Sequence, residues 1–330
     1  MDAAAIVIKD IRLRLRFSML ASGSSGNAAL LETDGFGLLI DAGLGPRQLS
    51  NRLSTVGASW QKVNAVILTH THSDHWKDRT FETLRRHQIP LYCHPEHQPP
   101  LRNYSLSFVK LEQAKLVRHY EASQPFRLSN SLHCLALELH HDSGPTFGFR
   151  LELAPDLFGS AGAIGYLADL GCWTEAQAQA LANVDILALE FNHDVEMERT
   201  SGRHWELIQR VLGDHGHLSN RQAAQFLHAI LDRSSPGLLQ HLVQTHLSRE
   251  CNHPSIAQAV AQDVLAARSP HTKLHTAQQN CPGPVLTLEY ANGSTQNGAA
   301  SDSVAAGLAR SASEERRTPS LALRANRPTE

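Results

Sequence analysis

The sequence lacks long apolar runs and has few cysteines. No stretch of the 330 residues approaches the run of about 18 apolar residues that a membrane helix needs, so we expect no membrane span. Residues 1–16 show no basic start followed by an apolar core and a cleavage site, which favours a cytoplasmic protein over a secreted one. The five cysteines are widely spaced and form no CxxC pair, so reduced thiols are expected instead of disulfides.

An excess of positive charge is also missing. The formal net charge is -2, which provides no global positive field for nucleic acid, so any such contact must be local. Hydrophobic residues make up 42% of the chain and charged residues 19%, as is ordinary for a globular protein. Histidine is the unusual residue, because 20 are present and imidazole is the commonest transition-metal ligand at neutral pH.

Strand-like and helix-like stretches alternate between residues 14 and 288. The expected strands are residues 13–20, 28–32, 38–40, 65–68, 91–93, 132–139, 147–153, 163–167, 186–189 and 239–243. Several strands come early as neighbours and others alternate with helices, which favours an α/β fold with helices on the outer faces of sheets. Thr174 and Ser219 precede apolar-periodic runs, so we expect both to be helix N-caps.

The composition divides the chain into three segments. Residues 1–13 are expected to be an N-terminal extension, and residues 14–290 are expected to form one folded domain. Residues 291–330 are rich in Ala, Ser, Gly, Arg and Asn and have few large apolar side chains. Because such a segment cannot offset the entropy of folding, we expect a disordered tail.

The strongest functional signal is the run His70-Thr-His72-Ser-Asp74-His75, which directly follows the apolar strand Ala65–Thr69. Three imidazoles and a carboxylate at a strand end can converge on a small volume, as nitrogen and oxygen metal ligands must. A lone histidine in this position would more often be structural. The full run indicates metal instead, because burying these groups without a metal would leave costly unpaired polar atoms.

The pattern HxHxDH after a strand resembles the signature of the metallo-β-lactamase superfamily. Four further marks of the family occur in order, and the match extends over about residues 17–288. The resemblance implies an αββα sandwich, in which two packed mixed sheets carry helices on their outer faces. The four marks are Asp41 before Ala42-Gly43, His141 after the strand 132–139, Asp169 after the strand 163–167, and His246 in Thr245-His246-Leu-Ser248-Arg249.

Three of these marks also leave an alternative open. Asp41 could cap a turn, and Asp169, which is followed by Leu-Gly, could be a turn aspartate. His140 and His141 point opposite ways at a strand end, so only one of them can be a ligand. We expect the ligand to be His141, because the following Asp142 completes a His-Asp pair seen in similar family members.

The resemblance implies a centre with two divalent metal ions. One ion would be held by His70, His72 and His141, the other by Asp74, His75 and His246, with Asp169 and a water or hydroxide as bridges. Two ions that share a water lower its pKa towards neutrality and so create a nucleophile. Asp41 is expected to support the metal loop, and Asp74 to serve in catalysis as well as in binding. Zinc suits this imidazole-rich set best, with manganese or iron as alternatives.

A glutamate and a histidine further along the chain resemble a pair in ribonuclease Z. Glu190 ends the apolar strand 186–190, and His217 lies in a segment similar to that group's GHS(T)xxxAA motif. A hydrogen bond between them would orient the imidazole to protonate a leaving alkoxide after attack on a phosphodiester. The alternative is that His217 merely precedes a helix.

Two other segments resemble the YycJ/WalJ branch of the superfamily, which implies a DNA exonuclease. One is the glycine-rich turn Ser22–Asn27, which would let a phosphate approach the backbone, and the other is Glu190-Phe-Asn192-His193-Asp194. We expect His193 to contact phosphate or to support the metal shell. The linker 154–162 is too short for the arm with which many relatives grip tRNA, which disfavours tRNA maturation.

Together these features predict a two-metal phosphodiesterase that acts as a nuclease. The resemblance to the YycJ/WalJ branch implies that its substrate is DNA. One alternative is a hydrolase of a small thioester, lactone or cyclic phosphate, which the same water could attack. A non-catalytic nucleic-acid-binding relative is disfavoured, because degenerate members lose ligands and all seven are present here. No membrane partner is expected, and the sequence carries no signal for an oligomeric state.

Overall fold

The structure is a computed structural model that describes residues 13–33, 35–154 and 162–290. Contacts between Cα atoms separate residues 1–294 from residues 295–330, and all described residues belong to the first unit. The predicted tail, nearly all of the predicted N-terminal extension and most of the linker 154–162 lie outside the described residues. Within the described ranges, no helix is long and apolar enough to cross a membrane.

The described strands form two seven-stranded sheets. The first sheet contains β1 (Leu13–Ala21), β2 (Ala28–Thr33), β3 (Phe36–Ile40), β4 (Ala65–Ile67), β5 (Leu91–Cys93), β6 (Val117–His119) and β14 (Leu286–Tyr290). The second contains β7 (Pro125–Arg127), β8 (Leu132–Leu139), β9 (Thr146–Leu153), β10 (Ala163–Leu167), β11 (Ile186–Glu190), β12 (His241–Thr245) and β13 (Lys273–Thr276). Their orders are β14-β1-β2-β3-β4-β5-β6 and β13-β12-β11-β10-β9-β8-β7.

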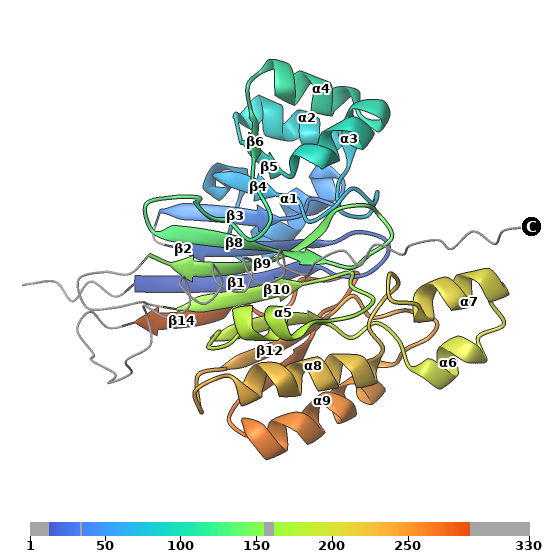
Figure 1. Cartoon of the computed structure of the whole chain (residues 1–330). Coiled ribbons are helices and arrows are strands. Elements are labelled where there is room, and N and C mark those ends of the chain that lie inside the picture. Colours follow the sequence, from blue (N-terminus) through green and yellow to red (C-terminus); the bar gives the residue numbers. More distant parts are fainter. Residues whose placement is uncertain (1–12, 34, 155–161, 291–330) are drawn as a thin grey trace, which may run out of the picture. The chain divides into compact units, whose positions relative to one another are not determined.

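Helices lie on the outer faces of the two sheets (Figure 1). The first sheet carries α1 (Pro46–Thr55), α2 (Asp78–His87), α3 (Gln98–Tyr104) and α4 (Leu106–Gln113), with short 3-10 helices η1 (Trp60–Lys62) and η2 (Pro95–His97) in the connections. The second carries α5 (Glu175–Ala180), α8 (Asn220–Asp232) and α9 (Pro254–Arg268), while α6 (Val195–Arg199) and α7 (Trp205–Leu212) lie to one side. Two mixed sheets with helices outside are the predicted fold class, which is confirmed.

The central strands β3 and β4 of the first sheet are buried on both faces. In β3, Leu38 and Ile40 pack into a core that includes residues of both sheets, whereas Leu39 packs into a second core with residues of α1, α2 and α4. Val66 of β4 also faces this second core, between Ala65 and Ile67. Because successive side chains of a strand point to opposite faces, burial on both faces requires a continuous apolar run.

The two predicted helix caps are confirmed. Thr174 Oγ1 accepts a hydrogen bond from Gln177 N (3.2 Å), and Gln177 Oε1 accepts one from Thr174 N (2.9 Å). Ser219 and Gln222 form the same reciprocal pair at the start of α8. Such a pair satisfies two backbone donors that a helix start leaves free, so the Ser219 cap fixes where α8 begins.

The strand directions bring several loops to one edge of each sheet. Since β8 is antiparallel to β9 and β9 to β10, β8 runs in the same direction as β10, β11 and β12. By the same reasoning β1, β3 and β4 run in one direction. A hydrogen bond from Phe147 N to Thr69 O (3.0 Å) joins the two edges. The loops after these strands therefore lie together, where sheets of this kind usually bind ligands.

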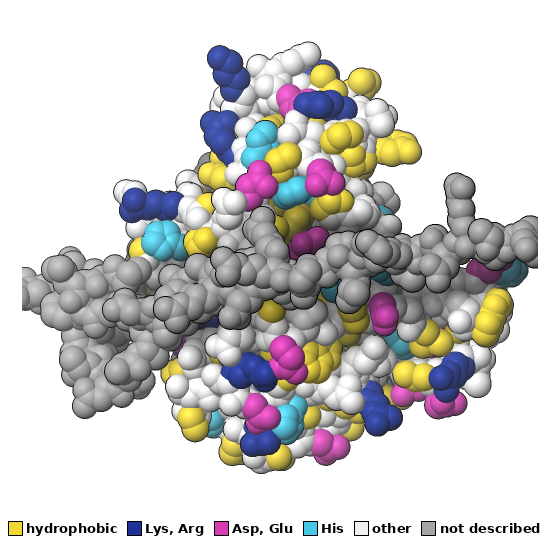
Figure 2. All heavy atoms as spheres, in the orientation of Figure 1, with side chains coloured by type: hydrophobic (Ala, Val, Ile, Leu, Met, Phe, Trp, Pro, Cys, Tyr) yellow, Lys and Arg dark blue, Asp and Glu magenta, His cyan; other side chains and the backbone are white. Residues whose placement is uncertain are grey.

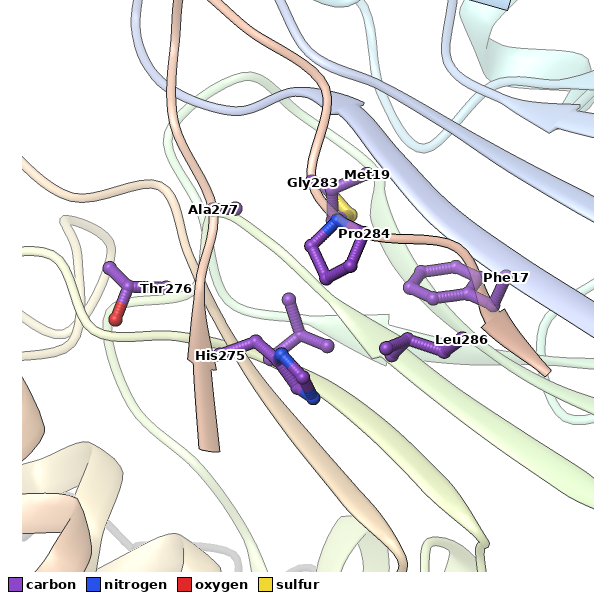
Figure 3. A pocket seen from close by; sticks show the side chains of 9 residues that line it. Phe17, Met19, His275, Thr276, Ala277, Gly283, Pro284 and Leu286 are labelled. Atoms are coloured by element: carbon purple, nitrogen blue, oxygen red, sulfur yellow. The ribbon is translucent and has the colours of Figure 1, made fainter. Parts of the chain in front are cut away.

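A small apolar crevice lies elsewhere, between residues of β1, β12, β13 and β14 (Figure 3). It is lined by Phe17, Met19, Val243, His275, Thr276, Ala277, Gly283, Pro284 and Leu286. None of the predicted site residues lines it, so this crevice is separate from the loops that carry them.

Gly43 lies where three of these loops meet. A Cβ atom there would overlap the carbonyl oxygen of Asp74 and would lie 2.7 Å from the backbone nitrogen of Asn27. These two backbone atoms are hydrogen-bonded to each other (2.8 Å), so they cannot move aside as the end of a flexible side chain could. The junction of the loops therefore depends on glycine at position 43.

We expect Gly43→Ala to lower the free energy of unfolding by about 3 kcal/mol or more, because backbone atoms would have to shift. Gly45→Ala is the matched control, since a Cβ there meets no atom within 4 Å and φ is -62°. Denaturant unfolding of both variants measures the difference. Equal stability of the two variants would contradict the close approach of the loops at Gly43.

Candidate metal centre

His70, His72 and His141 form the first of two sets of candidate ligands. His70 and His72 follow β4, and His141 follows β8. The ring centroids are 4.9 Å apart for His70 and His72, 5.3 Å for His70 and His141, and 5.0 Å for His72 and His141. One nitrogen of each ring lies within 4.8 Å of the others, so the three rings can share one ion.

The loop after β8 presents His141, and not His140, to this set. His140 is exposed, and its Nδ1 lies 3.1 Å from Cys172 Sγ. His141 is buried and donates from Nδ1 to the carbonyl oxygen of Gly216 (2.9 Å). That bond orients the ring and leaves Nε2 for a metal, as is usual for histidine ligands. Asp142 Oδ1 lies 3.4 Å from His141 Nε2, so the predicted His-Asp pair also faces the set.

Asp74, His75 and His246 form the second set. Asp74 Oδ2 lies 3.5 Å from His75 Nε2 and 3.8 Å from His246 Nε2. The three residues offer ligand atoms that all lie within 4.8 Å of one another. Asp74 and His75 belong to the loop after β4, whereas His246 follows β12. The loop after β4 of the first sheet therefore contributes to both sets, and loops of the second sheet contribute the remaining ligands, His141 and His246.

Asp169, which follows β10, lies between the two sets. Its Oδ2 is 4.0 Å from His70 Nε2 and 2.8 Å from His75 Nε2, and its Oδ1 is 2.8 Å from His246 Nδ1. Asp169 has φ 60° and His246 has φ 54°, a left-handed conformation that side-chain-bearing residues rarely adopt. Local strain of this kind persists where the surrounding structure enforces it, and it is concentrated at functional sites.

Several buried atoms of this cluster make no hydrogen bond to any described residue. They are His70 Nε2, His246 Nε2 and Asp169 Oδ2, although Asp169 Oδ2 is in ion-pair contact with His75 Nε2 (2.8 Å). A buried polar atom without a bonding partner costs about 1–3 kcal/mol, so these atoms require a partner that the protein itself does not supply. The atoms are imidazole nitrogens and a carboxylate oxygen that face one another, and this donor set fits a divalent cation such as zinc.

Asp41 is fully buried and holds His75 from behind. Its Oδ2 accepts a hydrogen bond from His75 Nδ1 (2.7 Å), and its Oδ1 accepts one from Thr69 N (2.9 Å). Asp41 is in none of the groups whose atoms could share an ion. These contacts are those expected of a residue that orients a ligand and does not bind the metal.

Burial and charge set the protonation of the two sets. Burial, and next the neighbouring His75, lower the pKa of His70 well below its usual range. Burial alone would also lower the pKa of His75, but Asp41 and Asp169 outweigh it and raise that pKa well above its usual range. For Asp169 burial is outweighed by His246 and His75, which hold its pKa well below normal. These shifts favour an ionised Asp169 and a neutral His70, the forms that bind metal, whereas His75 must lose its proton before it can bind.

Glu190 and His217 lie next to the second set. Glu190 is fully buried, and its Oε2 accepts hydrogen bonds from the backbone N–H groups of Leu170 (3.0 Å) and Leu218 (3.2 Å). His217 Nδ1 lies 2.8 Å from Glu190 Oε1, and the side chain of His217 is 13% exposed. Burial raises the pKa of Glu190, but His217 and His246 outweigh it and lower the pKa to about 2. The sequence-based pairing of the two residues is thus present in the structure.

His193 is the predicted site residue that belongs to none of the ligand sets. Its ring is fully buried, and neither ring nitrogen makes a hydrogen bond to a described residue. Its carbonyl oxygen accepts a hydrogen bond from Asn220 N (2.8 Å) at the start of α8. In this conformation no phosphate can reach the ring, so the structure does not place His193 where a phosphate contact requires it.

Three residues that the motifs contain, but to which we assigned no role, also contact the ligands. Asn27 Nδ2 donates to Asp74 Oδ2 (3.1 Å), and Asn192 Nδ2 donates to the carbonyl oxygen of His246 (2.8 Å). Ser22 Oγ accepts a hydrogen bond from His246 N (2.7 Å). The signal for them was their place in the Ser22–Asn27 and Glu190–Asp194 segments, but amide and hydroxyl side chains are common in turns.

The family comparison agrees with this geometry. The family profile described as "Beta-lactamase superfamily domain" matches residues 37–235, which is more than half of the chain. The chain belongs to this superfamily. In its metallo-hydrolase members the fold carries divalent metal, and the two sets of histidine and aspartate ligands described above indicate divalent metal binding by this member as well.

Two named relatives of this superfamily member are bacterial proteins. It is 28% identical over 248 residues to exodeoxyribonuclease WalJ of Streptococcus pneumoniae serotype 2 (strain D39), a match that covers 75% of this chain and 88% of WalJ. It is 26% identical over 255 residues to exodeoxyribonuclease YycJ of Bacillus anthracis, covering 76% and 89%. The crystal structure of YhfI from Bacillus subtilis, a metallo-β-lactamase fold protein, has the same fold, with a TM-score of 0.59, 16% identity and coverage of 84% of this chain and 100% of YhfI.

We expect about two metal ions per chain, because the ligands divide into two three-residue sets around Asp169. His70→Ala and His246→Ala should each empty or weaken a different site. His140→Ala is the control, since His140 is the exposed neighbour of a candidate ligand. Elemental analysis of protein refolded with zinc or manganese tests this expectation, and no more than trace metal in the unmodified protein would reject both sites.

Proposed function

We propose that the protein is a metal-dependent nuclease that hydrolyses phosphodiester bonds of DNA, with residues 14–290 as the functional domain. The observation that carries the proposal is the cluster of two ligand sets around Asp169 with the Glu190–His217 pair beside it. The WalJ and YycJ relatives, which match three quarters of the chain, are named exodeoxyribonucleases. Both observations support hydrolysis of a nucleic acid.

The candidate ligands would be divided between two metal ions. His70, His72 and His141 would hold one ion and Asp74, His75 and His246 the other, with Asp169 between them. Divalent ions in such a centre supply an activated water at neutral pH and neutralise charge that develops on phosphoryl oxygens. Asp41 orients His75 through Nδ1, and Gly216 orients His141 in the same way, so that Nε2 of each ring faces the centre.

His217, oriented by Glu190, would protonate the leaving group. The backbone N–H groups of Leu170 and Leu218 hold Glu190 Oε2, which fixes Oε1 as the acceptor for His217 Nδ1–H. This hydrogen bond orients the imidazole, whose partly exposed edge can deliver a proton to the departing oxygen. An alkoxide of DNA is a poor leaving group without that proton, so this pair matters most for the natural substrate.

The proposed activity is tested with metal-reconstituted protein and four substrates. They are 5′-labelled duplex DNA, single-stranded DNA, RNA and bis-p-nitrophenyl phosphate. We expect metal-dependent shortening of DNA, because the centre and the relatives' names both favour it. Hydrolysis of bis-p-nitrophenyl phosphate with every polynucleotide left intact would favour the small-molecule hydrolase instead.

His217→Ala should leave the metal content intact and slow DNA cleavage by about 10²- to 10⁴-fold, as removal of a positioned general acid does. The loss should be much smaller for bis-p-nitrophenyl phosphate, whose leaving group is stable without protonation. Turnover of both substrates and elemental analysis measure these effects.

His215→Ala is the matched control, because His215 is an exposed histidine two residues before His217. Equal slowing of both substrates by His217→Ala would assign His217 to substrate binding. Loss of metal would make His217 a ligand, as its position within 4.8 Å of atoms of Asp169, Glu190 and His246 allows.

A further inference from the structure

The turn between β1 and β2, residues 22–27, is fixed to the candidate metal centre at both of its ends. At one end Ser22 Oγ accepts a hydrogen bond from His246 N (2.7 Å). At the other end Asn27 N and Asn27 Nδ2 donate to Asp74 O (2.8 Å) and Asp74 Oδ2 (3.1 Å). Since His246 and Asp74 belong to one ligand set, the exposed tip of this turn stands directly beside that set.

The tip of the turn is held in one conformation by glycine and by Gln279. Gly23 has φ 135° and Gly26 has φ 156°, backbone conformations that residues with a side chain rarely adopt. Gln279 Oε1 accepts a hydrogen bond from Ser25 N (2.9 Å), and Gln279 Nε2 donates to Gly26 O (2.8 Å). The hydroxyl groups of Ser24 and Ser25 are therefore displayed on a rigid, exposed tip.

Arg249 contacts this tip from the loop after β12. Its Nη2 donates to Ser25 Oγ (3.0 Å), and its side chain is exposed. No carboxylate among the described residues forms an ion pair with it. The adjacent Glu250 is bound instead to Arg203 Nε (2.9 Å). Arg249 is thus a cation that the fold orients but does not neutralise.

Two other arginines near these loops are paired with carboxylates within the protein. Arg203 pairs with Glu198 and Glu250, and Arg210 pairs with Asp142. On the face seen in Figure 2, Lys and Arg side chains of the described residues are interspersed with Asp and Glu side chains. Arg249 differs from Arg203 and Arg210 because it has no ion-pair partner among the described residues and because it contacts the Ser22–Asn27 turn.

We propose that Arg249, Ser24 and Ser25 form a subsite for a second phosphate of the substrate, the one next to the phosphodiester under attack. Arg249 is three residues after His246, so it lies within about 11 Å of that candidate ligand along the chain. A guanidinium and serine hydroxyl groups are donors that suit phosphate oxygens. The inference rests on the proposed function and deepens it, because only a polynucleotide brings a second backbone phosphate.

Arg249→Ala tests the subsite in the metal-loaded full-length protein. We expect KM for duplex DNA to rise about tenfold, with little change in kcat, because a charged hydrogen bond to bound substrate is lost. The slope of log(kcat/KM) against log salt concentration should shrink by about one, as expected when one phosphate contact is removed. Bis-p-nitrophenyl phosphate has no second phosphate, so the fall in kcat/KM for this substrate should be several-fold smaller.

Arg86→Ala is the matched control, because it removes the same charge from an exposed arginine on α2 that pairs with Glu82. It should alter neither KM nor the salt slope. Arg249→Lys, which keeps the charge but lacks the planar fork, should lie between the unmodified protein and Arg249→Ala in KM.

Three outcomes would overturn the subsite. Salt slopes and KM values that are equal for Arg249→Ala and Arg86→Ala would show that Arg249 contacts no phosphate. Equal losses on both substrates, or loss of metal, would show that Arg249 supports the metal loop. An unmodified protein that cleaves bis-p-nitrophenyl phosphate but no polynucleotide would reject the proposed function and the subsite together, whereas the first two outcomes leave the nuclease proposal standing.

Discussion

The buried carboxylate of Asp169 is the interaction on which the rest of the candidate centre depends. Its Oδ2 faces His70 and His75, and its Oδ1 faces His246, so it contacts both ligand sets at once. A carboxylate at this depth is costly unless cations surround it, and converging histidine nitrogens are costly unless a cation or proton satisfies them. The Asp169 carboxylate and the histidine rings therefore lower each other's cost of burial, and a bound metal ion would lower it for both.

The fold meets this requirement by holding three of the candidate ligands through hydrogen bonds from other loops. Asp41, after β3, holds His75, and the carbonyl of Gly216, before α8, holds His141. Asn27, after β1, holds Asp74. These loops can meet only because β1, β3 and β4 run in one direction and the ends of both sheets are joined there. Support of this kind fixes ring orientation before metal arrives, which limits the ordering cost of binding.

The sequence predicted the strands that precede the candidate ligands well, because apolar runs buried on both faces are strong signals, and the structure brings the candidate ligands together. It missed the short outer strands β6, β7 and β13, which carry polar residues and no apolar run, and the strand β14. It placed β12 at residues 239–243, whereas the strand spans His241–Thr245. The burial of His193 could not be predicted, because it results from packing of the loop after β11 against the start of α8.

The charge balance of the loaded centre explains why local contacts would decide its substrate. Two divalent ions would bring four positive charges, whereas the candidate ligands include only two carboxylates, Asp74 and Asp169. The buried carboxylates of Asp41 and Glu190 contact these ligands and offset much of the remaining positive charge, and at physiological salt any field of the ions extends only about 8 Å. With a net charge of -2, the rest of the chain adds no general attraction. A phosphate beyond the one at the metals must therefore be recognised by donors close to the centre, and Arg249, which contacts the Ser22–Asn27 turn three residues after His246, is such a donor.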